Sequence, residues 1–170
     1  MSDISGNGIA KHTVSLLVHN RPGVLSRIAQ VFARRGYNID SLVVSPAHQE
    51  GFSRMTIVST GDAAILDQII KQLNKLVDCV RAVEHGGRES VERELALFKV
   101  QCDTVNRTEI LQISEVFRAK TVDISDESIT VEVTGTSDKL DAIESMLSRF
   151  GILEMVRSGK LIIARGAELT

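Results

Sequence analysis

Residues 20–25, Asn-Arg-Pro-Gly-Val-Leu, follow an apolar run at residues 14–18 and open a helical pattern. Proline is tolerated in the first turn of a helix because the first N–H groups there have no intrahelical partner. Glycine lets another molecule approach the backbone closely. The free N–H groups and the positive end of the helix dipole therefore predict an anion site, for a carboxylate or a phosphate, where a strand turns into a helix.

The elements predicted around this turn follow the order β-α-β-β-α-β. Apolar residues at helical spacing predict one helix at about residues 22–35, which Gly36 ends, and a second that opens at Gly61-Asp62. This order is the ferredoxin-like pattern, which is an α+β fold. The strands are predicted at about residues 12–19, 37–45, 53–59 and 78–85, and the inward face of the first helix is Leu25, Ile28, Ala29 and Phe32.

The same order recurs in the second half of the chain, after a boundary at Gly86-Gly87 and the charged residues 88–94. Val-Phe-Ala-Arg-Arg at residues 31–35 corresponds to Val-Phe-Arg-Ala-Lys at residues 116–120. We therefore predict two ferredoxin-like domains in tandem, at residues 11–86 and 87–170, after a flexible lead-in at residues 1–10. The predicted strands of the second domain are about 95–102, 121–125, 128–134, 152–156 and 160–164, with a helix that Asn106 caps and another at 137–150.

The second copy lacks the opening turn, because Gln101-Cys102-Asp103-Thr104-Val105 replaces the Asn/Pro/Gly sequence. Only the first domain is therefore expected to bind a ligand there. A sheet with helices on one face leaves its edges available, so pairing with a second copy of the chain is expected.

Composition argues against a nucleic-acid partner. The RNA-recognition fold has this same order of elements, and Gly51-Phe52-Ser53-Arg54 faintly resembles its aromatic strand motif. That mode of binding stacks bases on two or three exposed rings, whereas this chain has 4% aromatic residues and a net charge of -2. No apolar run is long enough to span a bilayer and no secretory signal is present, so we expect a cytoplasmic protein without a membrane anchor.

No convincing set of catalytic residues converges in the sequence. His12, His19, His48 and His85 lack metal-ligand spacing, and the GxSxG, GxxxxGK[ST] and GxGxxG motifs do not occur. Cys79 and Cys102 form neither a disulfide framework nor a CxxC motif, and we expect both to be buried. The sequence therefore predicts no catalytic residue and no metal ligand.

Two asparagines suggest what the anion site holds. Asn20 ends the first predicted strand and Asn38 lies near the start of the second. We expect these two strands to lie beside each other in the sheet, so that both amides lie near the N-terminus of the first helix. An amide supplies both donor and acceptor atoms, so the two could hold the ammonium and carboxylate of a free amino acid. The apolar neighbours Val24, Leu25 and Ile39 favour an aliphatic side chain. The alternative is that Asn20 merely caps the helix and Asn38 is a turn residue.

The run from Asn20 to Ile39 resembles the start of an ACT domain, a small regulatory module. More narrowly, the chain from about Lys11 to Gly166 resembles the small regulatory subunit of acetohydroxyacid (acetolactate) synthase. The stretches that carry this resemblance are Arg35–Leu42, Ser53–Ile57, Gln72–Val77, Glu92–Leu95, Ile113–Lys120, Arg157–Gly159 and Ala164–Gly166.

The resemblance implies a non-catalytic subunit of a homodimer that activates a separate large catalytic subunit and confers feedback inhibition by valine. Thiamine diphosphate, magnesium and FAD are then expected on the large subunit, with no cofactor on this chain. Valine is expected between two ACT domains, in contact with Asn20, Gly23, Val24 and Leu25 of one chain and with Asn38 and Ile39 of the other.

Two other functions remain open from the sequence. A free-standing ACT-type amino-acid sensor with another enzyme partner would carry the same fold. A small ferredoxin-like hydrolase is disfavoured, because the reactive groups that it needs are missing. The sequence also does not decide between valine, leucine and isoleucine as the ligand.

Overall fold

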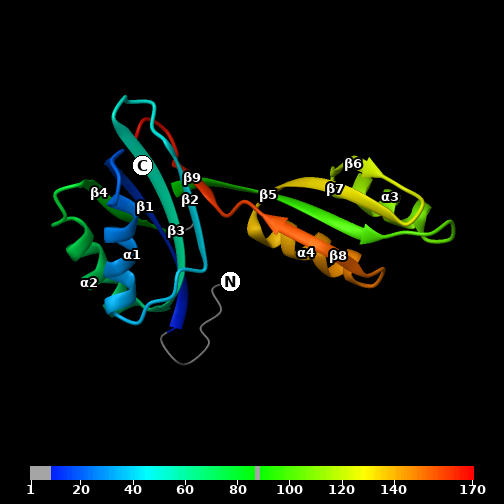
Figure 1. Cartoon of the computed structure of the whole chain (residues 1–170), viewed down its shortest axis with the longest axis horizontal. Helices are drawn as coiled ribbons and strands as arrows, with labels where there is room; N and C mark the ends of the chain where they lie inside the picture. Colours follow the sequence, from blue (N-terminus) through cyan, green and yellow to red (C-terminus); the bar gives the residue numbers. More distant parts are fainter. Residues whose placement is uncertain (1–8, 87–88) are drawn as a thin grey trace. The chain divides into compact units, whose positions relative to one another are not determined.

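The computed structural model describes residues 9–86 and 89–170, which form two compact units (Figure 1). In the first unit, α1 (Val24–Arg34) and α2 (Ala63–Leu73) pack side by side on one face of a sheet. The four strands of this sheet are antiparallel to their neighbours and follow the order β2-β3-β1-β4. These strands are β1 (Ile9–His19), β2 (Ser41–Pro46), β3 (Phe52–Asp62) and β4 (Cys79–His85).

Strand alternation explains the core of the first unit. Val14, Leu16 and Val18 of β1 are fully buried under the two helices, as strand residues two apart share one face. Ile28 and Phe32 of α1 pack onto them. The helix begins one residue after Gly23 rather than at Pro22, and its buried face includes Val24 and Val31.

The second unit repeats this architecture. Its strands follow the order β6-β7-β5-β8, which matches β2-β3-β1-β4 strand for strand, so the repeat and the α+β fold class are confirmed. Its core gathers around Phe98 and Ile110. The elements are β5 (Ser90–Gln101), α3 (Arg107–Val116), β6 (Lys120–Ile124), β7 (Ser128–Gly135), α4 (Ser137–Ser148) and β8 (Ile152–Arg157).

The C-terminal segment differs from the predicted domain division. One unit reaches to Val91 and also includes Lys160–Thr170, and the other is Glu92–Gly159. Strand β9 (Leu161–Ala164) pairs with β5, and the guanidinium groups of Arg54 and Arg81 donate hydrogen bonds to the carbonyl oxygens of Thr170 and Leu169. Residues 160–170 therefore belong with the first unit and not with the second domain, because polar side chains of the first sheet hold them.

Several predicted boundaries also move. Ile9 and Ala10 belong to β1 and pair with Asp62 and Gly61, so they are not part of a flexible lead-in; residues 1–8 of that lead-in lie outside the described residues. β5 begins at Ser90, within the charged stretch interpreted as a boundary, whose Gly87 and Arg88 are also outside the described residues. β2 begins at Ser41, four residues later than predicted, so Asn38 and Ile39 lie in a loop.

The face of α1 is a further correction. Leu25 was predicted to point inward, but 43% of it is exposed. Val24, Ile28 and Val31 fill the core at a spacing that is equally helical, so periodicity alone could not choose between the two apolar stripes. Leu25 is thus available for contact with another molecule. Both cysteines are buried, as predicted. None of the helices among the described residues is long and apolar enough to cross a membrane.

Candidate functional site

The turn between β1 and α1 is built by backbone hydrogen bonds at the end of the sheet. The N–H of Asn20 donates to the Gly51 oxygen at 2.9 Å, and the N–H of Arg21 donates to the His19 oxygen at 3.0 Å. Gly23 precedes the helix with a φ of 82°, in the left-handed region that glycine adopts without strain. Glycine is needed at this position because any other residue would be strained there.

The N-terminus of α1 has no capping carboxylate. Among the residues that the structure describes, no side chain caps the first N–H groups of α1, and the first turn contains no acidic residue. A Cβ atom at Gly23 would lie 3.6 Å from the Arg27 guanidinium, which is ion-paired with Asp78 at 2.5 Å. The uncapped N–H groups and the helix dipole favour an anion at this end of the helix, whereas the charge of Arg27 is already compensated by Asp78.

The turn before the corresponding helix of the second unit contains a carboxylate of its own, although no side chain caps α3 itself. The Asp103 side chain accepts hydrogen bonds at 2.8 Å from the N–H groups of both Val105 and Asn106, just before α3. Asn106 is the N-cap residue, but its own side chain does not cap the helix; its oxygen accepts from the Asp103 N–H instead. A carboxylate of the chain thus lies at the N-terminus of α3, whereas α1 leaves the equivalent position open.

Four of the predicted ligand contacts have the exposure that a site needs. Asn20, Gly23 and Asn38 are exposed, and Leu25 is partly exposed. Val24 is only 3% exposed, so its side chain belongs to the core and only its backbone faces the turn. The Asn20 side chain does not cap α1, which is contrary to the purely structural alternative for that residue.

Asn38 and Ile39 do not lie near Asn20 in the same chain. The expectation that the first two strands are neighbours is wrong, because β3 lies between β1 and β2. Asn20 follows His19, which pairs with Phe52 at the start of β3, whereas the N–H of Asp40 bonds to Val58 near the end of β3. The two asparagines are therefore at opposite ends of the sheet, since β1 and β2 run parallel to each other with β3 antiparallel between them.

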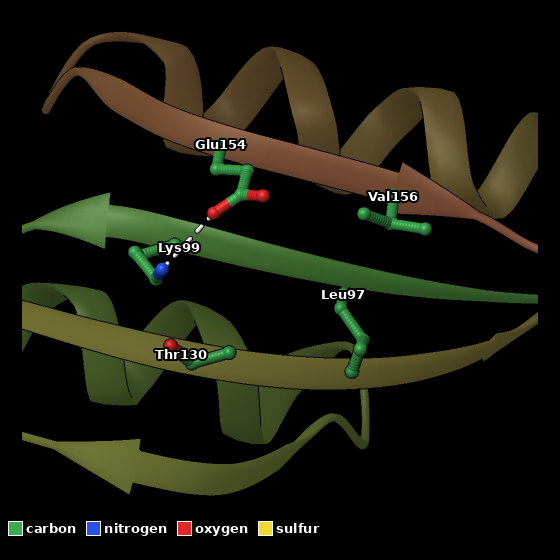
Figure 2. A pocket seen from close by; sticks show the side chains of 5 residues that line it. All are labelled: Leu97, Lys99, Thr130, Glu154 and Val156. Carbon is green, nitrogen blue, oxygen red and sulfur yellow. Dashed lines mark hydrogen bonds and ion pairs between the residues drawn. The ribbon is translucent and has the colours of Figure 1, made fainter.

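Apart from the turn before α1, a hollow lies on the face of the second sheet that is not covered by helices (Figure 2). Lys99 and Glu154 point toward each other there and form an ion pair at 3.0 Å. Because the two charges compensate each other, this hollow has no excess of either charge to bind an ion. Its other lining residues are Leu97, Thr130 and Val156.

Catalytic groups do not converge in the described residues. Ser15 and His85 are the pair that most resembles a nucleophile and its base, with 2.6 Å between Oγ and Nε2. Ser15 is only 2% exposed within a central strand, however, and cannot reach a substrate. Glu84 pairs with His12 at 2.6 Å. Within residues 9–86 and 89–170, no three His, Cys, Asp or Glu side chains gather as metal ligands.

Comparison with known protein families matches both halves of the chain. Residues 14–81 match the model of the AHAS small subunit-like ACT domain, where AHAS stands for acetohydroxyacid synthase. Residues 93–166 match the model described as the small subunit of acetolactate synthase. The two matches together span most of both units.

Individual relatives agree with these models. The acetolactate synthase small subunit of Mycolicibacterium smegmatis is 48% identical over 94% of this chain and 94% of its own length. A probable acetolactate synthase small subunit of Archaeoglobus fulgidus is 46% identical over 92% of this chain and 98% of its own length. The crystal structure of the acetolactate synthase small subunit from Thermotoga maritima superposes with a TM-score of 0.83 at 40% identity, and covers 92% of this chain and 98% of that one.

Proposed function

We propose that this chain, which belongs to the family of acetolactate synthase small subunits, binds a branched amino acid between two copies of its first unit and thereby regulates the large subunit. Family membership makes it a regulatory subunit whose partner is a large catalytic subunit. Valine as the effector, the homodimer and the site residues are parts of the proposal.

The open N-terminus of α1 is the observation that carries the proposal. A free carboxylate fits there, because the N–H groups after Gly23 have no side-chain cap and the positive end of the helix dipole lies at this turn. The contrast with α3, where Asp103 supplies its own carboxylate, supports a ligand in the first unit and none in the second.

The edge of the first sheet supports a two-chain site. The strand order of the first sheet ends in β2 and β4, and that of the second in β6 and β8. Of these four strands, only β2 has no charged residue. Each of the others carries both signs of charge, and charges on an edge strand discourage pairing with another strand. β2 is thus the edge best suited to pair with a second copy. The charged residues of the other edges are Arg81 and Glu84 in β4, Lys120 and Asp123 in β6, and Glu154 and Arg157 in β8.

Antiparallel pairing of two β2 strands would bring the separated asparagines together. The Pro46 end of β2 pairs with Ser53 and lies at the same end of the sheet as Asn20. A two-fold axis beside β2 aligns this end with the Ser41 end of the partner's β2. The partner's Asn38 would then lie at the end of the sheet that carries Asn20 and Gly23. This geometry agrees with a ligand held by both chains.

The apolar side chains near the two ends of the first sheet favour an aliphatic ligand. Leu25 is partly exposed on α1, and Ile39 is partly buried against the core of the first unit. A branched side chain such as that of valine would bury apolar area against them, while its carboxylate remains at the helix N-terminus. The proposed contacts are Asn20, Gly23, Val24 and Leu25 of one chain with Asn38 and Ile39 of the other.

Regulation requires the effector to favour one state of the complex. Binding alone changes no rate, so valine must bind more tightly to a less active state of the assembled enzyme than to a more active one. In this proposal the chemistry takes place on the large subunit, with its thiamine diphosphate, magnesium and FAD. The chain described here supplies the effector site and contacts to that subunit.

Calorimetric titration tests the assigned site. We expect wild-type protein to bind valine, and Asn20→Ala to bind it at least about tenfold more weakly, because a hydrogen bond to a charged group is lost. Asn106→Ala is the matched control, because Asn106 precedes the corresponding helix of the second unit, and it should bind valine as the wild type does. Equal binding by wild type and Asn20→Ala would remove Asn20 from the site.

A further inference from the structure

The loop before β2 is fixed to the end of β3 by an aromatic ring. Tyr37 is 7% exposed and its hydroxyl donates a hydrogen bond to the Asp62 carbonyl oxygen. The ring lies directly over Gly61, so a Cβ atom there would collide with the ring carbon Cζ. Real Cβ atoms do not approach other atoms so closely, and a buried ring cannot easily move away. Gly61 is thus the residue that makes room for Tyr37.

Asp40 fixes the same loop from its other end. Its N–H donates to the Val58 oxygen at 2.8 Å, and its Oδ2 accepts from the Thr60 hydroxyl at 2.7 Å. Its second oxygen, Oδ1, accepts from Nδ2 of Asn38 at 3.1 Å. The loop therefore lies between two attachments to β3, one through Tyr37 and one through Asp40, with Asn38 between them.

These contacts determine which atom Asn38 presents. An ionised carboxylate only accepts hydrogen bonds, so the amide nitrogen of Asn38 must face Asp40. The amide oxygen of Asn38 then points away from Asp40 and is an acceptor for a donor outside the loop. With the negative charge of Asp40 nearby, the best donor is a cation such as an ammonium group.

We infer that residues 37–40 are a preorganised segment for recognising the ammonium group of the effector, in which Asn38 contacts the ligand. Tyr37, Asp40 and Gly61 act as its positioning residues. This inference rests on the proposed function and deepens it, since it assigns opposite chemistry to the two ends of the sheet. The α1 end offers N–H donors to a carboxylate, and the loop end offers an acceptor and a negative charge to an ammonium.

The second unit provides a matched control for Gly61. Gly135 is the last residue of β7, and Gly61 is likewise near the end of β3. The two strands occupy the same place in the strand orders of the two sheets. A Cβ atom at Gly135 would meet one partly exposed side chain, that of Lys139, with Cδ at 2.5 Å and both Cβ and Cγ at 3.3 Å. The same glycine-to-alanine change therefore displaces one lysine side chain at Gly135, whereas at Gly61 it collides with a buried ring.

The test compares valine with 3-methylbutanoate, which is valine without its ammonium group, as calorimetric ligands of the full chain. Wild type should bind valine at least about tenfold more tightly than 3-methylbutanoate, the ratio expected for a charge-assisted hydrogen bond. In Asp40→Asn that ratio should fall toward one through weaker binding of valine alone, because the amide of the new side chain no longer fixes the orientation of Asn38. Gly61→Ala should lose about tenfold in valine affinity, while Gly135→Ala should not change it.

The outcomes separate this inference from the proposed function. If Asp40→Asn weakens both ligands equally, or neither, the ammonium assignment is overturned while valine binding by wild type stands. If wild type binds no valine, leucine or isoleucine, the proposed function fails and the inference fails with it. Asp40 is exposed, so Asp40→Asn keeps the test decisive even if Gly61→Ala does not fold.

Discussion

Carboxylates distinguish the two helix N-termini that follow β1 and β5: Asp103 precedes α3 and Glu109 lies in its first turn, whereas the first turn of α1 has none. Asp103 satisfies the backbone donors before α3, and the left-handed Gly23 precedes α1 with no acidic neighbour in the first turn. Because the two units share one fold, this difference in acidic side chains explains why one turn is suited to an external anion and the other is not.

Gly23→Asp tests the anion site directly. The new carboxylate would lie at the helix N-terminus and compete with that of the ligand, so valine affinity measured by calorimetry should fall by more than tenfold. The backbone at Gly23 has a φ of 82°, so the change should also cost about 1 kcal/mol of stability.

Gly166→Asp is the control for that strain. Gly166 has a φ of 70° and a Cβ atom there would meet nothing within 4 Å. It should show a similar loss of stability and unchanged valine binding. If both variants bind valine equally well, the open N-terminus of α1 is not the carboxylate site.

Strand β2 differs from the other sheet edges because it carries no charge, and we expect it to pair with a second copy. Val44, in the middle of this strand, is 43% exposed. Val44→Lys should convert a dimer into an 18.6 kDa monomer in analytical ultracentrifugation, because two like charges would meet across the two-fold axis. Val122→Lys on β6, the equivalent edge of the second unit, should leave the mass unchanged. A monomeric wild type, or a Val44→Lys dimer, would contradict pairing through β2.

Hydrophobic periodicity in the sequence was enough to predict the order of elements in both units. It could not choose the buried face of α1, since Leu25 and Val24 both fit a helical stripe. It also placed the start of β2 at Tyr37, although Tyr37 to Asp40 form a loop whose hydrogen bonds go to the end of β3. Those bonds join residues about twenty positions apart, which no local pattern reports.

The site was predicted in part. Gly23 was recognised from the Pro-Gly turn, because its backbone requirement is local. The role of Gly61 depends on a ring that lies over it, and the separation of Asn20 from Asn38 depends on the insertion of β3 between two strands. Both are tertiary facts. The C-terminal segment was misassigned for the same reason, as its contacts to Arg54 and Arg81 are distant in sequence.

The stability of the first unit should decrease at alkaline pH. Burial raises the pKa of the Cys79 thiol above its ordinary value of 9.0, and a hydrogen bond with the Arg81 backbone opposes this weakly. The folded state therefore favours the protonated thiol, whereas the unfolded chain loses that proton at lower pH. This contribution is complete below pH 9 and is lost as the pH rises through the folded pKa.

Denaturant unfolding at pH 7 and pH 10 measures this effect. Cys79→Ala should cost about 1 kcal/mol at pH 7 through lost packing, and the difference from wild type should shrink at pH 10. A difference that stays constant, or grows, with pH would show that the buried thiol does not contribute to the alkaline transition.

Two units of one fold, of which only the second places a carboxylate in the turn before its first helix, suit a subunit that senses a ligand on behalf of a partner. Reconstitution of the full chain with the large subunit of acetolactate synthase tests this account most directly, through the rate of acetolactate formation with and without valine. We predict that the chain raises the rate and that valine then lowers it, while Gly23→Asp makes the complex insensitive to valine. Activation that valine, leucine and isoleucine all leave unchanged, or no activation at all, would contradict the account.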